Sequence, residues 1–97
     1  MKIRWSDSSR LDLDRIYAFI AEDSPRSAAD VEDRIFGAAE GLASFPNKGR
    51  PGRLDGTREM VVTPTPYLII YEVFDEHVSI LRVVHGNQLW PPVEDAR

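Results

Sequence analysis

Two apolar runs in the second half of the chain constrain its fold most strongly. Residues 66–74 and 77–86 are rich in β-branched and aromatic side chains, and the polar pair Asp75-Glu76 separates them. Such runs on either side of a short polar turn predict the two strands of an antiparallel hairpin. The first run shows little alternation of apolar and polar residues, as expected of a central strand that is covered on both faces. The rest of the chain must therefore cover this hairpin.

Two helices are predicted ahead of the hairpin. The first has apolar residues at the spacing of one helical face, namely Leu13, Ile16, Tyr17 and Ile20. The second starts at Ser24-Pro25, because serine caps free N–H groups and proline needs no donor at the first helical position. Phe45-Pro46 ends it, since proline disfavours helical geometry in the preceding residue. Its small residues would let another helix approach closely, so a helical hairpin is expected.

The remaining segments complete an α+β fold. Residues 2–5 alternate polar and apolar side chains and predict a short strand, and residues 57–62 predict another. Residues 48–56 are punctuated by glycine and proline and are expected to form a surface loop. The order is therefore β-α-α-β-β-β, a small antiparallel sheet with the helical hairpin on one face. Residues 1–97 are expected to form a single domain whose tail is flexible from about residue 91.

Composition argues against several classes of protein. The chain has no cysteine, and neither of its two histidines has a carboxylate pair at ligand spacing, so we expect no metal and no cofactor. No segment approaches the ~18 apolar residues of a membrane span, and no signal peptide is evident, which predicts a cytoplasmic protein without a membrane partner. The net charge of −4 argues against tight DNA binding by this chain alone, although cations gather between residues 48 and 58.

Four segments of the second half form a recurrent pattern. They are residues 58–62, 66–73 and 80–86 and the pair Trp90-Pro91. Together with the two helices they resemble the RelE/ParE toxin superfamily of type II toxin-antitoxin systems, and they are closer to its ParE-like branch. The resemblance implies a growth inhibitor that is neutralised by a cognate antitoxin, a protein with a DNA-binding domain and a disordered tail. It also implies a role such as plasmid stabilisation.

The resemblance implies two different activities. RelE-like members cut mRNA on the ribosome, which requires cations near the scissile phosphate and an acid/base residue. At two positions where such nucleases tend to have arginine, this chain has Leu68 and Gln88. We therefore expect a ParE-like toxin that binds DNA gyrase without being an enzyme. The alternative is a ribosome-dependent mRNA endonuclease that uses Arg58, Arg82 and His85, and a third is a relative that binds a partner without toxicity.

The candidate residues for binding the antitoxin or the target lie in the loop, the strands and the end of the chain. They are Arg50, Arg53, Arg58, Glu59, Tyr71, Arg82, His85, Gln88 and Trp90. None is assigned to a metal, and none is assigned to catalysis unless the chain is a nuclease.

Several of these candidates also have a structural interpretation. Arg82 is expected on the same face as Ile80 and Val84, where a carboxylate such as Glu72 would pair with it across the hairpin. A histidine at a strand end, even with an ordinary pKa near neutrality, more often makes local hydrogen bonds than acts as a general base. Trp90 is expected either to pin the tail to the sheet or to belong to an interface.

Overall fold

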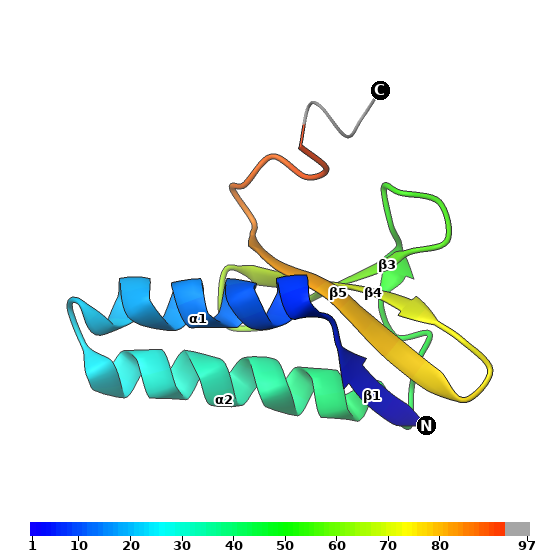
Figure 1. The fold of residues 1–97 in the computed structure, drawn as a ribbon, viewed down its shortest axis with the longest axis horizontal. Coiled ribbons are helices and arrows are strands. Elements are labelled where there is room, and N and C mark those ends of the chain that lie inside the picture. Colours follow the sequence, from blue (N-terminus) through cyan, green and yellow to red (C-terminus); the bar gives the residue numbers. More distant parts are fainter. Residues whose placement is uncertain (93–97) are drawn as a thin grey trace.

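The computed structural model describes residues 1–92, and residues 93–97 lie outside the described part, as does most of the tail predicted to be flexible. Figure 1 shows that the helices lie beside a sheet. The elements are β1 (Lys2–Trp5), α1 (Asp7–Ala21), α2 (Pro25–Gly41), β2 (Arg50–Pro51), β3 (Arg58–Val61), β4 (Tyr67–Val73) and β5 (His77–His85). The α+β class and the order of the predicted elements are confirmed. The additional two-residue strand β2 lies inside the predicted loop.

The described strands form one five-stranded sheet in the order β1-β5-β4-β3-β2. The predicted hairpin of β4 and β5 is central, and β2 to β5 are antiparallel neighbours. In contrast to the antiparallel sheet expected from the sequence, β1 is parallel to β5, with Lys2 opposite His77 and Trp5 opposite Ile80. The long connection through α1 and α2 permits this, because parallel neighbours need a crossover and cannot be joined by a tight turn. The sheet is therefore mixed.

The two helices pack side by side on one face of the sheet and enclose the main core (Figure 1). The N-caps are formed by Ser6, which accepts the N–H of Ser9, and by Ser24, which accepts the N–H of Ser27. The predicted stripe of α1 is correct for Leu13, Ile16 and Ile20, which pack into this core. It is wrong for Tyr17, which is 37% exposed.

The opposite face of the sheet has a second, smaller core. It contains Leu68, Ile70, Val84 and Trp90, against which Leu54 of the loop is packed. Because β4 is covered on both faces, its sequence has no need of a polar face, which explains the weak alternation of residues 67–71. No helix among residues 1–92 is long and apolar enough to cross a membrane.

A β-bulge interrupts the pairing of β4 and β5. Ile70 lies opposite Arg82, but the next residue, Tyr71, lies opposite Ile80, so Leu81 is an extra residue in β5. One extra residue inverts the alternation of side chains along a strand. Ile80 consequently packs in the helix-side core, whereas Val84 packs in the opposite core with Trp90, over whose ring Arg82 lies. The prediction that Arg82 shares a face with Ile80 is therefore wrong, whereas the prediction that it shares a face with Val84 is correct.

Candidate functional site

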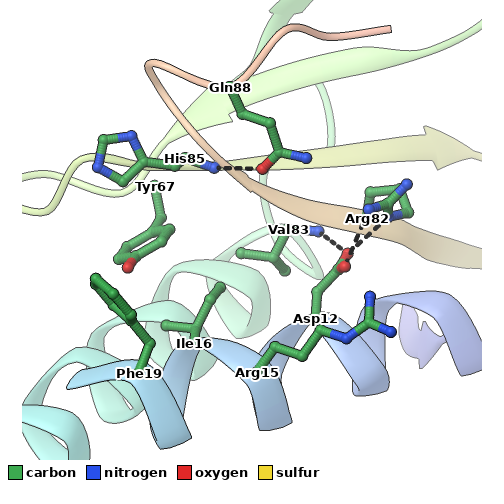
Figure 2. Close-up of a pocket in the computed structure, with 9 residues that line it drawn as sticks. All are labelled: Asp12, Arg15, Ile16, Phe19, Tyr67, Arg82, Val83, His85 and Gln88. Atoms are coloured by element: carbon green, nitrogen blue, oxygen red, sulfur yellow. Dashed lines mark hydrogen bonds and ion pairs between the residues drawn. The ribbon is translucent and has the colours of Figure 1, made fainter. Parts of the chain in front are cut away.

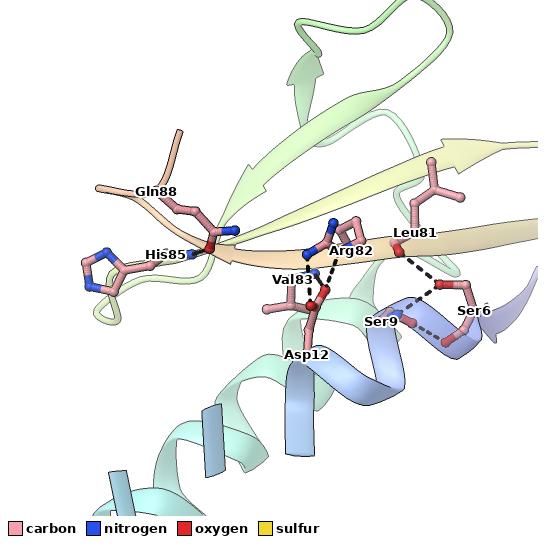
Figure 3. A network of polar contacts seen from close by, with 8 residues as sticks. All are labelled: Ser6, Ser9, Asp12, Leu81, Arg82, Val83, His85 and Gln88. Atoms are coloured by element: carbon pink, nitrogen blue, oxygen red, sulfur yellow. Dashed lines mark hydrogen bonds and ion pairs between the residues drawn. The ribbon is translucent and has the colours of Figure 1, made fainter. Parts of the chain in front are cut away.

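Beyond the bulge, the edge of β5 faces α1 instead of another strand. β1 is paired only with residues 77–80, which leaves the groups of residues 81–85 on that edge without a strand partner. Polar groups at the start of α1 replace the strand: the Ser6 hydroxyl donates to the carbonyl of Leu81 at 2.8 Å (Figure 3). One carboxylate oxygen of Asp12 accepts the N–H of Val83 at 2.8 Å. These bonds fix α1 against the end of β5.

Asp12 also binds the guanidinium of Arg82. Its two carboxylate oxygens accept Nε at 2.7 Å and Nη2 at 3.0 Å, which makes the ion pair bidentate (Figure 3). The Asp12 residue is only 7% exposed. The prediction that Arg82 pairs with Glu72 is therefore wrong. The bulge separates these two residues, and α1 brings Asp12 to the strand edge instead. The guanidinium also lies over the Trp90 ring, with Cζ 5.5 Å from the ring centroid.

Asp12 was not among the candidates chosen from the sequence. It precedes Leu13 directly and lies four residues before Ile16, both of which pack into the core. A carboxylate at this border of an apolar stripe is partly turned toward the sheet, which is the signal that the sequence contained. The partner strand edge was not visible in the sequence, because it depends on the short pairing of β1.

A pocket of about 290 Å³ opens beside this ion pair, between α1 and the ends of β4 and β5 (Figure 2). Its lining consists of Asp12, Arg15, Ile16, Phe19, Tyr67, Arg82, Val83, His85 and Gln88. One side is apolar and is formed by Ile16, Tyr67 and Val83. Phe19 also lines the pocket, and 70% of this residue is exposed. The other side has two arginines, Arg15 and Arg82, and one carboxylate, Asp12, which is bound to Arg82. The α1–β5 pocket is therefore amphipathic and has a small excess of positive charge.

The side chains of His85 and Gln88 are held by local hydrogen bonds. The His85 backbone N–H donates to Oε1 of Gln88 at 3.3 Å, and Nδ1 of the imidazole accepts the N–H of Asn87 at 3.0 Å. A neutral imidazole whose Nδ1 is an acceptor carries its proton on Nε2. The ring meets Tyr67 edge to face at a centroid distance of 5.4 Å, and burial raises the pKa of the Tyr67 phenol. His85 thus makes the local contacts expected of a histidine at a strand end.

A second group of candidates surrounds the buried carboxylate of Glu59, which is 2% exposed. One oxygen accepts Nη2 of Arg50 at 3.1 Å, and the other accepts the backbone N–H of Arg53 at 3.0 Å. Burial by itself raises the pKa of Glu59, but the N–H of Arg53 and the guanidinium of Arg50 outweigh it and hold the pKa below its ordinary value. Glu59 therefore anchors the loop as an anion.

Tyr71 and Arg58 bind the start of the same loop. The Tyr71 hydroxyl donates to the carbonyl of Pro46 and accepts the N–H of Gly49, both at 2.8 Å. Nη1 of Arg58 donates to the carbonyl of Gly49 at 2.6 Å. Burial raises the pKa of Tyr71, and the Gly49 hydrogen bond and the charge of Arg58 only partly oppose this. Tyr71 is 0% exposed, so its described contacts are all internal.

Trp90 contacts both the residues around Glu59 and the Arg82–Asp12 ion pair. Nη1 of Arg53 donates to the backbone carbonyl of Trp90 at 2.8 Å, and the Trp90 ring contacts the Arg82 guanidinium. The Trp90 residue is 8% exposed. Its contacts with the second core agree with the interpretation that it pins the tail to the sheet. Leu68 belongs to the same core and faces away from the α1–β5 pocket, so the residue at that position says nothing about charge in the pocket. Residues 1–92 contain no cluster of histidine and acidic side chains that could hold a metal.

Comparisons with known proteins agree on one family. Residues 3–90 match the family model of the ParE toxin of the type II toxin-antitoxin system parDE. The Y4kP protein of Sinorhizobium fredii is 45% identical over 92 residues, which are 95% of each chain. Toxin RelE2 of Caulobacter vibrioides is 36% identical over 88 residues, covering 91% of this chain and 98% of that protein. The chromosomal ParDE system from P. aeruginosa includes a chain with the same fold, with a TM-score of 0.78, 24% identity and coverage of 88% and 95%.

Proposed function

The chain belongs to the ParE toxin family of type II toxin-antitoxin systems, and we propose that this toxin inhibits growth by binding DNA gyrase. The inhibition requires no chemical step. Its binding site is the α1–β5 pocket, including the exposed side chains of Arg15 and Phe19 that line it. A cognate antitoxin, made of a DNA-binding domain and a disordered tail, holds the toxin inactive. The family match, in which toxin and antitoxin form a pair, supports this partner.

The pairing of Arg82 with Asp12 is the observation that carries the proposal. A phosphate-cleaving site needs positive charge that faces the substrate and a base that removes a proton. Here the Nε and Nη2 groups of Arg82 both bind Asp12, and Gln88 offers no permanent charge. His85 has no carboxylate among its described partners to orient it as a base. An amphipathic pocket of this kind suits side chains of a protein partner.

The test is a supercoiling assay with purified gyrase in which cleavage complexes are also followed. We expect the wild-type chain to inhibit supercoiling and to accumulate cleavage complexes. Phe19→Ala and Arg15→Ala, at exposed positions of the pocket, should each weaken inhibition about tenfold, in the range of an interface anchor. Tyr17→Ala is the matched control, because Tyr17 is an exposed aromatic of α1 that does not line the pocket. Absence of any effect on gyrase at high excess of toxin would reject the proposal.

The second candidate is a ribosome-dependent mRNA endonuclease. One observation favours it: Arg82, His85 and the buried Tyr67 line the same pocket, and Arg15 adds a cation. The third expected catalytic residue, Arg58, belongs to the loop cluster and binds backbone carbonyls there. Primer extension on translated mRNA would reveal site-specific cuts if this reading is right. His85→Ala should then abolish them, with its melting temperature checked against the wild type.

A further inference from the structure

The segment that follows β5 turns at the end of the strand and buries Trp90 in the second core. The Gly86 N–H donates to the carbonyl of Pro66 at 2.7 Å, and the Gln88 N–H donates to the carbonyl of His85 at 2.9 Å. These bonds direct the chain so that Gln88 lines the α1–β5 pocket, whereas Trp90, two residues later, lies on the sheet face opposite the helices. The segment therefore connects the pocket with the second core.

The guanidinium of Arg82 contacts both the Asp12 carboxylate and the Trp90 ring. The carboxylate accepts Nε at 2.7 Å and Nη2 at 3.0 Å (Figure 3), and the ring centroid lies 5.5 Å from Cζ. An aromatic face attracts a cation placed over it, so the ring favours one position of this long side chain. Arg82 lines the pocket and Trp90 does not. Trp90 can therefore influence the pocket through the position of Arg82.

Arg53 of the loop holds the backbone of Trp90. Its Nη1 donates to the Trp90 carbonyl at 2.8 Å. Arg53 is itself fixed to β3, because its backbone N–H donates to Oε2 of Glu59 at 3.0 Å and its Nε lies 3.8 Å from Oε1. The next residue, Leu54, packs against the second core. The loop therefore fixes both the carbonyl of Trp90 and the core in which its ring is buried.

These contacts form a continuous series from the loop to the pocket. The series runs from Glu59 through Arg53 and Trp90 to Arg82 and Asp12. Glu59, Arg53 and Trp90 do not line the pocket, so none of them touches a molecule that is confined to it. A contiguous series of packed side chains and hydrogen bonds can carry energetic coupling between two such regions.

We propose that Arg53 and Trp90 are positioning residues for the α1–β5 pocket. Arg53 fixes the Trp90 carbonyl, the Trp90 ring fixes the guanidinium of Arg82, and the chain before Trp90 places Gln88 in the pocket lining. The loop at residues 48–56 thereby controls the affinity of a pocket that it does not line. The consequence for gyrase rests on the proposed function, but the position of Arg82 can be measured without gyrase.

Hydrogen exchange of the Arg82 Nε–H in the free chain, followed by NMR, tests this role. Arg53→Ala and Trp90→Leu should each raise the exchange rate at least about fivefold, because the guanidinium loses its fixed position against Asp12. Leucine keeps apolar volume in the second core but offers no aromatic face. The backbone amides of β4 report global opening, so a rise confined to Arg82 separates positioning from a general loss of stability.

Two matched controls isolate the contact with Trp90. Arg50 also binds Glu59, at 3.1 Å, and its side chain is 56% exposed against 50% for Arg53, but it has no hydrogen bond or ion pair with Trp90 within residues 1–92. Arg50→Ala should therefore leave the exchange rate within about twofold of the wild type. Trp90→Phe keeps an aromatic face for Arg82 and removes Nε1–H, which has no hydrogen-bond partner among the described residues. It should also stay within about twofold.

Arg53→Ala replaces an exposed side chain, so it decides the test even if Trp90→Leu fails to fold. An unchanged exchange rate in Arg53→Ala overturns the proposal. An equal rise in Arg50→Ala also overturns it, because the effect would then pass through Glu59 and not through Trp90.

The supercoiling assay measures the consequence for binding. Arg53→Ala and Trp90→Leu should each weaken inhibition of gyrase about fivefold, whereas Arg50→Ala and Trp90→Phe should stay within about twofold. In the Trp90→Leu background, Arg53→Ala should add less than about twofold, because the ring through which it acts is gone. Full inhibition by Arg53→Ala, with an active wild type, overturns the proposed control of affinity. If the wild type leaves gyrase unaffected, the proposed target fails, while the exchange rates still decide whether Arg53 and Trp90 position Arg82.

Discussion

At the scale of single residues, Asp12 is the most consequential polar side chain near the pocket. It satisfies the Val83 N–H and two donors of Arg82, so its removal leaves both groups without their carboxylate. Asp12→Ala should lower the free energy of unfolding by about 2–3 kcal/mol. This loss is smaller than that expected on breaking a fully buried ion pair, because 28% of the Arg82 side chain is exposed. Chemical denaturation measures this loss. Asp14 is exposed, so Asp14→Ala should change the free energy of unfolding by less than about 0.5 kcal/mol. Equal losses in the Asp12 and Asp14 variants would contradict the stabilising role of Asp12.

Glu59 should make stability depend on pH. Its pKa is lowered in the folded chain, so the native state favours the ionised form. The resulting stabilisation is complete above the ordinary carboxyl pKa of about 4.3 and is lost as pH falls through the lower folded pKa. Glu59→Gln should therefore be less stable than the wild type at neutral pH and should lose less stability on acidification.

Denaturation curves between pH 7 and about pH 3 measure this dependence on Glu59. Glu40→Gln is the control, because Glu40 is exposed on α2 and forms no ion pair with the described residues. Parallel pH profiles for Glu59→Gln and the wild type would show that Glu59 does not carry the acid sensitivity.

At the scale of elements, the sequence correctly predicted features that depend on neighbouring residues, such as the start of a helix and its packed face. Ser24 with Pro25 marked the start of α2, and apolar spacing marked the packed face of α1, because capping and helical periodicity act within a few residues. The bulge at Leu81 was not predictable in this way, since the pattern of β5 contains no glycine or break at that point. The partner of Arg82 was consequently misassigned. Likewise, the parallel pairing of β1 depends on a contact between residues more than seventy positions apart.

The N-cap of α2 provides a prediction for a whole element. The Ser24 hydroxyl oxygen accepts the N–H of Ser27 at 3.1 Å, and this bond satisfies one of the free donors of the first turn. Ser24→Ala should lower the free energy of unfolding by about 1 kcal/mol. Ser8→Ala, at an exposed position of α1 that is not a cap, should be nearly neutral. Thermal unfolding followed by circular dichroism compares them, and equal melting temperatures would mean that the cap does not limit stability.

For the molecule as a whole, the distribution of charge decides what it can bind alone. The cations between residues 48 and 58 suggested a basic patch, but the buried Glu59 partly neutralises it through Arg50 and Arg53. Asp12 does the same for Arg82 at the α1–β5 pocket. The sequence does not reveal which arginine each of these acids binds, because each ion pair joins segments that are brought together only in the folded chain. Fewer cations are therefore available to bind a polyanion than the net charge of −4 alone suggests.

This charge distribution predicts that the isolated toxin does not bind operator DNA tightly. Most affinity for DNA comes from lysine and arginine contacts with phosphates, and here Arg50, Arg53 and Arg82 are engaged by carboxylates. At physiological salt, fluorescence anisotropy with operator DNA should give a Kd for the toxin alone no tighter than about 10⁻⁶ M, the range of non-specific binding. The complex with antitoxin should bind at least about a thousandfold more tightly, because the antitoxin supplies the DNA-binding domain. Nanomolar affinity of the toxin alone would mean that cations outside these ion pairs suffice to hold DNA.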